Sequence, residues 1–128
     1  MRIIIDTNFM ITLVKEKISL DESLEELFGI YKLVVPIQVI KELEKLSEDK
    51  KQKVKDREAT KISLQLLKDT EKINLEKEFV DAGIIKYVKD HKATLVATLD
   101  KELKQKIRII SPETKFLTIR AKKKIEVQ

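Results

Sequence analysis

Short apolar runs alternate along this chain with longer segments of helical periodicity. The first run, at residues 2–5, contains three consecutive isoleucines and leaves no polar face, as expected of a strand buried on both sides. Further strands are expected at residues 32–35, 72–75, 93–98 and 116–119. Helices are expected at residues 7–15, 20–28, 36–47, 50–68, 79–89 and 101–107. This alternation predicts a three-layer α/β/α sandwich around a central, mainly parallel sheet.

The length of 128 residues fits one domain with a single well-buried core. We expect residues 1–120 to form that domain and residues 121–128 to form a loose basic tail. The charged helix at residues 50–68 is expected to bury an apolar face made of Val54, Ile62, Leu66 and Leu67.

Composition excludes several classes of site. The chain has no cysteine, so it has no disulfide, no thiolate zinc site and no cysteine nucleophile. Two glycines and no glycine-rich segment exclude a P-loop and a dinucleotide fingerprint. No apolar run is long enough to span a bilayer and the N-terminus lacks a signal-peptide layout, so the cytoplasm is the expected location, with no membrane partner.

The net charge is concentrated at one end of the chain. Residues 101–128 carry nine basic and three acidic groups, a net charge of +6, whereas residues 1–100 carry a net charge of −1. Such asymmetry is typical of a polyanion-binding surface. The alternative is a solvated lysine-rich end that only aids solubility.

Four acidic residues lie where carboxylates are unfavourable. Asp6 and Asp100 each follow a strand-like run, while Glu42 and Asp81 belong to helices with apolar periodicity. A lone carboxylate near an apolar core costs roughly several kcal/mol unless it is paired or bound to a metal. In parallel sheets, sites form beyond the carboxyl ends of the strands, where these acids could meet. The alternative, which holds for most of the 22 acids, is a helix cap or a surface charge.

A cluster of three or four carboxylates favours a hard divalent cation. Mg²⁺ and Mn²⁺ take oxygen ligands and are commonly held by a few carboxylates together with substrate phosphate. One or two such ions could activate water and stabilise the leaving oxygen in phosphodiester hydrolysis.

Two stretches resemble the PIN-domain nucleases. The opening IIIDTN at residues 3–8 resembles the first motif of that family, and residues 80–108 resemble the second half of its fold. The most specific match is DHK at residues 90–92 followed by VATLDKELK at residues 96–104. The similarity is greatest to the PIN proteins of small-subunit ribosomal RNA processing and their archaeal relatives, and extends to toxins of the VapC type.

The resemblance implies roles for particular residues. The catalytic and metal-binding acids of the family correspond to Asp6, Glu42, Asp81 and Asp100. Neighbouring groups that would orient these acids are Thr7, Asn8 and Thr98. The chain departs from many relatives by having Ala82 after the third acid and Leu99 before the fourth.

The resemblance also implies an activity and its partners. PIN proteins cleave RNA with Mg²⁺ or Mn²⁺, often as homodimers; some are toxins paired with an antitoxin, and others act in ribosome assembly. The expected substrate is single-stranded RNA or structured rRNA or tRNA, because in-line attack needs an accessible phosphate.

Basic side chains near the fourth acid are the expected RNA contacts. Lys101, Lys104 and Arg108 are spaced to share one helix face beside Asp100. We expect this face to contact phosphate rather than merely to be solvated. The other expected contacts are in the C-terminal tail, at Lys122, Lys123 and Lys124.

Two other functions fit the same elements. The first is an RNA-binding PIN-like module without turnover. The second is a phosphoacceptor domain of the receiver type, which usually has adjacent acids after its first strand; here Asp6 is followed by Thr7 and Asn8, so this hypothesis ranks last.

Overall fold

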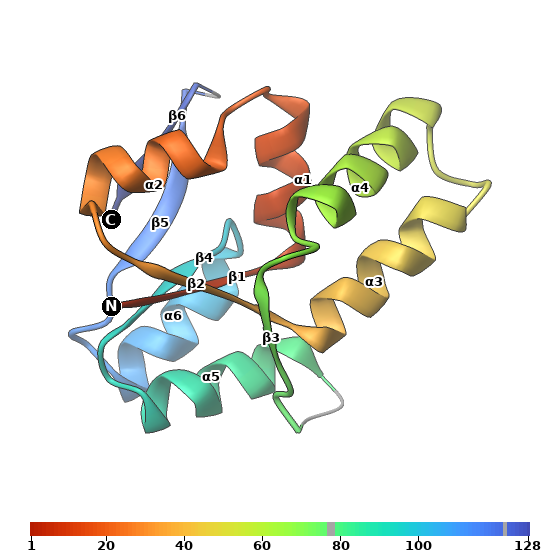
Figure 1. The fold of residues 1–128 in the computed structure, drawn as a ribbon. Helices are drawn as coiled ribbons and strands as arrows, with labels where there is room; N and C mark the ends of the chain where they lie inside the picture. The colour runs from red at the N-terminus through yellow and green to blue at the C-terminus, as the bar shows by residue number, and fades with distance from the viewer. Residues whose placement is uncertain (77–78, 122) are drawn as a thin grey trace.

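The computed structural model describes residues 1–76, 79–121 and 123–128. Six strands and six helices alternate along the described chain (Figure 1). In chain order they are β1 (Arg2–Ile5), α1 (Thr7–Lys15), α2 (Leu20–Phe28), β2 (Lys32–Pro36), α3 (Ile37–Glu48), α4 (Val54–Leu66), β3 (Glu71–Ile73), α5 (Val80–Asp90), β4 (Thr94–Ala97), α6 (Lys101–Ile110), β5 (Phe116–Arg120) and β6 (Lys124–Val127). No helix in these ranges is long and apolar enough to cross a membrane.

All six strands belong to one sheet in the order β3-β2-β1-β4-β5-β6. The first four pairings of this order are parallel, and only β6 runs antiparallel, against β5. The central strand β1 pairs with β2 on one side and β4 on the other, which explains why residues 3–5 have no polar face. The predicted three-layer sandwich with a mainly parallel sheet is confirmed.

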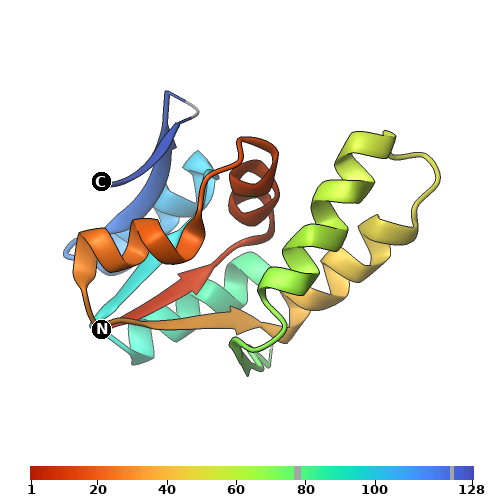
Figure 2. The same ribbon diagram turned by 45° about the horizontal axis from the view of Figure 1, so that its top comes forward.

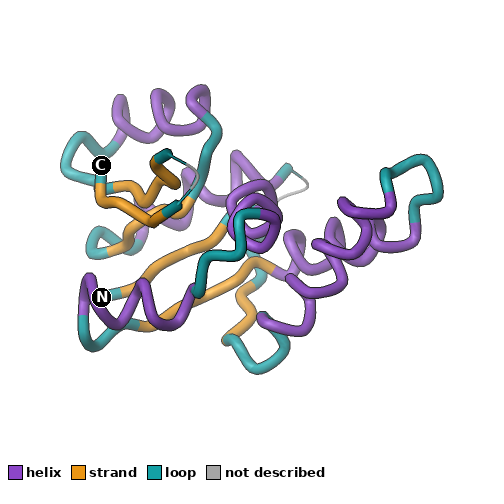
Figure 3. Tube along the Cα trace, turned by 90° about the horizontal axis from the view of Figure 1, so that it is seen from above, coloured by secondary structure: helices purple, strands orange, loops and turns teal. Residues whose placement is uncertain are grey.

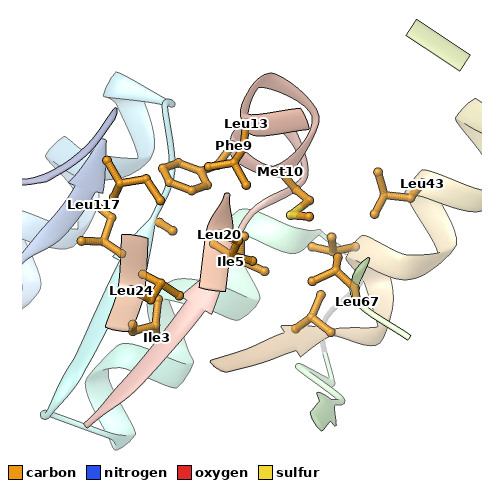
Figure 4. Close-up of a cluster of buried hydrophobic side chains, with 14 residues drawn as sticks. Ile3, Ile5, Phe9, Met10, Leu13, Leu20, Leu24, Leu43, Leu67 and Leu117 are labelled. Atoms are coloured by element: carbon orange, nitrogen blue, oxygen red, sulfur yellow. The ribbon is translucent and has the colours of Figure 1, made fainter. Parts of the chain in front are cut away.

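Two cores cover the two faces of the sheet. On one face, Ile3 and Ile5 pack with Phe9 and Met10 of α1 and with Leu24 of α2 (Figure 4). On the other face, Ile84 and Val88 of α5 and Leu103 and Ile107 of α6 pack with Ile4 of β1 and Val96 of β4. Successive isoleucines of β1 therefore serve opposite cores, because side chains alternate along a strand.

Helices α3 and α4 form an antiparallel pair that extends to one side of the sheet (Figures 2 and 3). The predicted apolar face of α4 is wrong at three positions: Val54, Ile62 and Leu66 are exposed, and only Leu67 is buried. The helix buries small side chains instead, namely Ala59, Thr60 and Ser63. The hydroxyls of Thr60 and Ser63 donate to main-chain carbonyls of α4, at 2.7 Å in each case, so their burial leaves no polar group unsatisfied. Small residues at a helix contact also allow the axes to approach closely.

The C-terminal segment is not a loose tail. Residues 124–127 form β6, which pairs with β5 from Leu117↔Val127 to Arg120↔Lys124, and Ile125 is buried. The prediction failed because this strand depends on a partner in β5, and local composition carries no trace of that pairing. Helix α6 also continues to Ile110, beyond the predicted end at residue 107.

Candidate functional site

Asp6 lies at the carboxyl end of the central strand and caps helix α1. Its main-chain N–H continues the sheet by donating to Ala97 O at 3.0 Å. Its carboxylate is held on both oxygens: Oδ1 accepts from the Thr7 N–H at 2.8 Å, and Oδ2 accepts from Thr98 Oγ1 at 2.9 Å. The residue is only 8% exposed. One of the two strand-end acids is therefore fixed in position before any ligand binds.

Asp100 occupies the equivalent place after β4, at the start of α6. Its Oδ1 accepts from the N–H groups of Glu102 and Leu103, at 2.9 and 3.1 Å. Its own N–H donates to Thr98 Oγ1 at 3.1 Å. The Thr98 hydroxyl thus donates to Asp6 and accepts from Asp100, which ties the two strand ends together.

Glu42 and Asp81 approach the same edge of the sheet from α3 and α5. Both line a cavity of about 600 Å³, to which Lys106 of α6 is the other charged contributor among the described residues. Asp81 sits in the first turn of α5, where the helix dipole favours an acid. Phe79, which is largely exposed, lies at the same cavity.

The four carboxylates influence one another electrostatically. Burial raises the pKa of Asp6 above its ordinary value, and the charges of Asp81 and Glu42 raise it further, while the bonds from Thr98 and Thr7 oppose the shift. Burial also raises the pKa of Asp81, with the charge of Asp100 adding to it and Lys106 opposing it. The acids predicted from strand ends and helix patterns therefore belong to one negatively charged site.

The donor chemistry of this site suits a hard cation. Carboxylate oxygens dominate it, and the nearby Thr7 Oγ1 is buried without a hydrogen-bond partner in the described structure. Among the described residues, no three acidic or histidine side chains are grouped closely enough to hold a metal ion together. A bound cation would therefore take only part of its ligands from the protein and the rest from water or a substrate phosphate.

The other predicted site residues fall into different settings. Thr7 supports Asp6 through its main-chain N–H, whereas Asn8 is exposed. Lys101 and Arg108 are exposed on α6, but Lys104 is only 6% exposed and donates to Gln128 Oε1 at 2.8 Å. In the C-terminal segment Lys123 and Lys124 are exposed, and Lys122 lies outside the described residues.

Lys106 was missed in the sequence. Besides lining the cavity with Glu42 and Asp81, its Nζ lies 3.3 Å from Glu102 Oε1 one helical turn earlier. The spacing of a glutamate four residues before a lysine was visible. The sequence did not show that Lys106 lies on the face of α6 that is turned towards α5, whereas Lys101 and Arg108 lie on another face.

Replacing Thr98 by valine should destabilise the folded chain by about 1–3 kcal/mol, because the buried Asp6 carboxylate loses a donor and the Asp100 N–H loses an acceptor. Urea unfolding of Thr98→Val against wild type measures this difference. Thr98→Ser keeps the hydroxyl and is the matched control. A Thr98→Val chain as stable as wild type would show that these bonds contribute nothing.

The stability advantage of Asp6→Asn over wild type should grow with pH in the absence of divalent metal. Because the folded pKa of Asp6 is raised, the folded chain binds its proton more tightly than the unfolded chain does. As pH rises from the ordinary value of 3.8 through the raised folded pKa, wild type therefore loses stability that the variant does not lose. Thermal unfolding in EDTA across this pH range gives the difference. A difference that is flat, or that shrinks with rising pH, contradicts this reading.

Comparison with known proteins places the chain among PIN-type sequences. The family described as "PIN like domain" matches residues 3–122. Ribonuclease VapC4 of Methanocaldococcus jannaschii is 30% identical over 127 residues, covering 98% of this chain and 95% of that protein. The solved PIN domain endonuclease Utp24 is 34% identical with a TM-score of 0.80, covering 99% of this chain and 90% of that one. VapBC2 from Rickettsia felis, solved with a promoter DNA fragment, is 14% identical with a TM-score of 0.54, covering 92% and 98%, a likeness of fold alone.

Proposed function

We propose that this chain, which belongs to the PIN-like domain family, is a metal-dependent endoribonuclease that hydrolyses RNA phosphodiester bonds. The observation that carries the proposal is the convergence of Asp6, Glu42, Asp81 and Asp100 into one electrostatically linked site at the carboxyl edge of the sheet. Two whole-length relatives named as a ribonuclease and an endonuclease support the same conclusion.

The proposed cofactor is Mg²⁺ or Mn²⁺, with one or two ions held by these four carboxylates. A bound divalent ion supplies Lewis-acid stabilisation of the charge that develops on phosphate and activates a water molecule. The cluster favours such an ion because burial and mutual repulsion make its own negative charge unfavourable.

In this proposal the protein side chains position the metal ion and the RNA phosphate and form no covalent bond with the substrate. Asp6 and Asp100 are oriented by the shared Thr98 hydroxyl and by main-chain N–H groups of α1 and α6. Such supporting bonds keep ligand oxygens aimed at one point. Lys106 places a positive charge at the cavity that Glu42 and Asp81 line, where it can neutralise a substrate phosphate oxygen.

The proposed substrate is RNA with an accessible phosphate, either single-stranded or within structured rRNA or tRNA. In-line attack on phosphorus needs space on the side opposite the leaving oxygen, and the cavity of about 600 Å³ beside Asp81 has room for a backbone phosphate. Exposed cations at Lys101, Arg108, Lys123 and Lys124 supply the sequence-independent attraction that phosphates need.

Cleavage of end-labelled RNA tests the proposal directly. Wild type should cut single-stranded RNA with Mg²⁺ or Mn²⁺, lose this activity in EDTA and regain it when the metal is restored in excess. A DNA oligonucleotide of the same sequence is the matched substrate and should be cut more slowly. The proposal would be contradicted if cleavage persisted in EDTA, or if the nuclease activity separated from the protein on a second chromatography column.

A second candidate is an RNA-binding module without turnover in ribosome assembly. It is favoured by the finding that no three described acids are grouped tightly enough to hold an ion as they stand. This function predicts salt-sensitive RNA binding, no cleavage with either metal, and no change in affinity when Asp6 or Asp100 is replaced by asparagine.

The biological setting is proposed from the relatives. A role in trimming ribosomal RNA precursors would follow from the resemblance of residues 80–108 to the PIN proteins of that process, whereas the resemblance to VapC-type toxins would imply an antitoxin partner. The toxin role would be supported if a neighbouring gene encoded a small DNA-binding protein and that protein co-purified with this chain. We also propose a homodimer, which light scattering of the purified protein tests by mass.

A further inference from the structure

Helix α6 separates two cavities of opposite charge. On one side Lys106 faces the acidic cavity of Glu42 and Asp81. On the other side a cavity of about 320 Å³ is lined by three cations, Lys101, Lys104 and Arg108, and by the polar side chains of Gln105 and Thr118. Among the residues that the structure describes, no acidic side chain lines this second cavity, which we call the cationic pocket. Asp100 lies at the head of the helix between the two, because its neighbours Leu99 and Lys101 belong to the pocket.

Two of the three cations of the pocket, Lys104 and Arg108, are held in place. Lys104 is buried, and its Nζ donates to Gln128 Oε1 at 2.8 Å, which leaves other N–H groups of that ammonium for a ligand. The Arg108 guanidinium lies over the Phe116 ring, 5.0 Å from its centroid. Both contacts fix charged groups that would otherwise be mobile, so binding an anion here needs little further ordering.

The three positive charges are not neutralised by the protein. Among the described residues none of them forms an ion pair, whereas Lys106 on the opposite side of α6 is paired with Glu102. Burial lowers the pKa of Lys104, and the charges of Arg108 and Lys101 lower it further. Like charges gathered without a counter-charge are unfavourable until an anion joins them.

We propose that the cationic pocket binds a phosphodiester of the RNA strand next to the one that reaches the acidic site. This inference rests on the proposed function, since it assigns the pocket to the same substrate. Its size suits a phosphate group, and Arg108 and Lys101 supply the donors that phosphate prefers. A strand that crosses the start of α6 at Asp100 would place consecutive phosphates in the two cavities. The pocket then sets the register of the substrate, as phosphate contacts commonly do.

Binding of a fluorescent single-stranded RNA of about twelve nucleotides, in EDTA so that nothing is cut, tests the pocket. Lys101→Ala and Arg108→Ala should each weaken binding about three- to tenfold. Each should also reduce the salt slope of the affinity by about 0.7, the share of one phosphate. Both residues are exposed, but Arg108→Ala also removes the contact with the Phe116 ring, so urea unfolding of each variant must show that the fold is kept. Lys61→Ala, an exposed cation on α4, is the matched control and should change neither quantity.

A second measurement locates the contact. Shortening the RNA one nucleotide at a time from each end should reach a length at which Arg108→Ala no longer weakens binding, because the phosphate it would contact is gone. Arg108→Lys should keep most of the affinity for the full RNA. Loss of affinity that is equal in Lys61→Ala, or that persists at every RNA length, would overturn the proposal.

The pocket and the proposed activity can fail separately. If wild type cuts RNA but both pocket variants bind and cut like wild type, the pocket inference is overturned and the nuclease proposal stands. If wild type binds RNA through the pocket but cuts nothing with Mg²⁺ or Mn²⁺, the pocket inference stands and the nuclease proposal fails.

Discussion

The Asp6→Asn variant should cut RNA at least about a hundredfold more slowly than wild type while remaining fully folded. Asparagine keeps the shape of the side chain and can still accept hydrogen bonds, but it removes the charge from the acid that is most firmly held in the site. Metal stabilisation of the transition state is worth about several kcal/mol, and each 1.36 kcal/mol is a factor of ten in rate. Single-turnover cleavage of labelled RNA with Mn²⁺ measures the loss.

The same substitution should not weaken the fold at neutral pH. Burial raises the pKa of Asp6 and the charges of Asp81 and Glu42 raise it further, so above that raised pKa the folded chain holds an unfavourable charge that asparagine removes. Activity and stability should therefore change in opposite directions, as is common where a site holds unfavourable charge. Asp69→Asn, at an exposed acid, is the control and should alter neither. Wild-type cleavage rates in Asp6→Asn would exclude Asp6 from the reaction.

Gly83→Ala should destabilise the chain by about 1–2 kcal/mol although alanine is the better helix former. A Cβ at this position of α5 would lie 2.6 Å from Leu75 Cβ and 2.8 Å from its Cδ1. The gain in helix propensity is about 1 kcal/mol, whereas overpacking of a buried contact costs about 1–3 kcal/mol. The clash prevails because Leu75 Cβ is tied to the main chain and cannot rotate away. Urea unfolding gives the net change.

Combining Gly83→Ala with Leu75→Ala identifies the cause. The shorter side chain removes Cγ and Cδ1 but keeps Cβ, so the pair should be less unstable than the sum of the single changes, without full recovery. Because Asp81 lies two residues before Gly83 on α5, a displaced helix should also lower RNA cleavage. Additive losses, or a Gly83→Ala chain more stable than wild type, would show that α5 moves aside freely.

Local patterns predicted most of the fold, and they failed where a distant partner decides. Residues 3–5 could be assigned to a central strand because three β-branched side chains leave no face for water. The prediction of the buried face of α4 was wrong because the residues buried there are Ala59, Thr60 and Ser63, which are too small and polar to form an apolar stripe. Strand β6 was missed because it exists only through its pairing with β5.

The residues of the site likewise divide into those that local sequence could predict and those that it could not. Asp6 and Asp100 could be predicted from their place after strands. The family resemblance suggested Thr98 as an orienting group, and the structure adds that its hydroxyl joins both acids. Glu42 and Asp81 stand out less clearly from the apolar pattern of their helices, and the family resemblance was needed to assign them to the same site. The burial of Lys104 could not be foreseen, since it depends on the C-terminal strand that brings Gln128 to it.

The two outermost strands of the sheet also bear on self-association. β3 has three residues and exposes Glu71 and Lys72, while β6 has four and exposes Lys124. Short strands with charged side chains discourage another chain from adding to a sheet, because the newcomer would have to bury those charges. The sheet is therefore protected against edge-to-edge growth at both ends. We therefore expect concentrated solutions of this chain to resist aggregation by strand pairing.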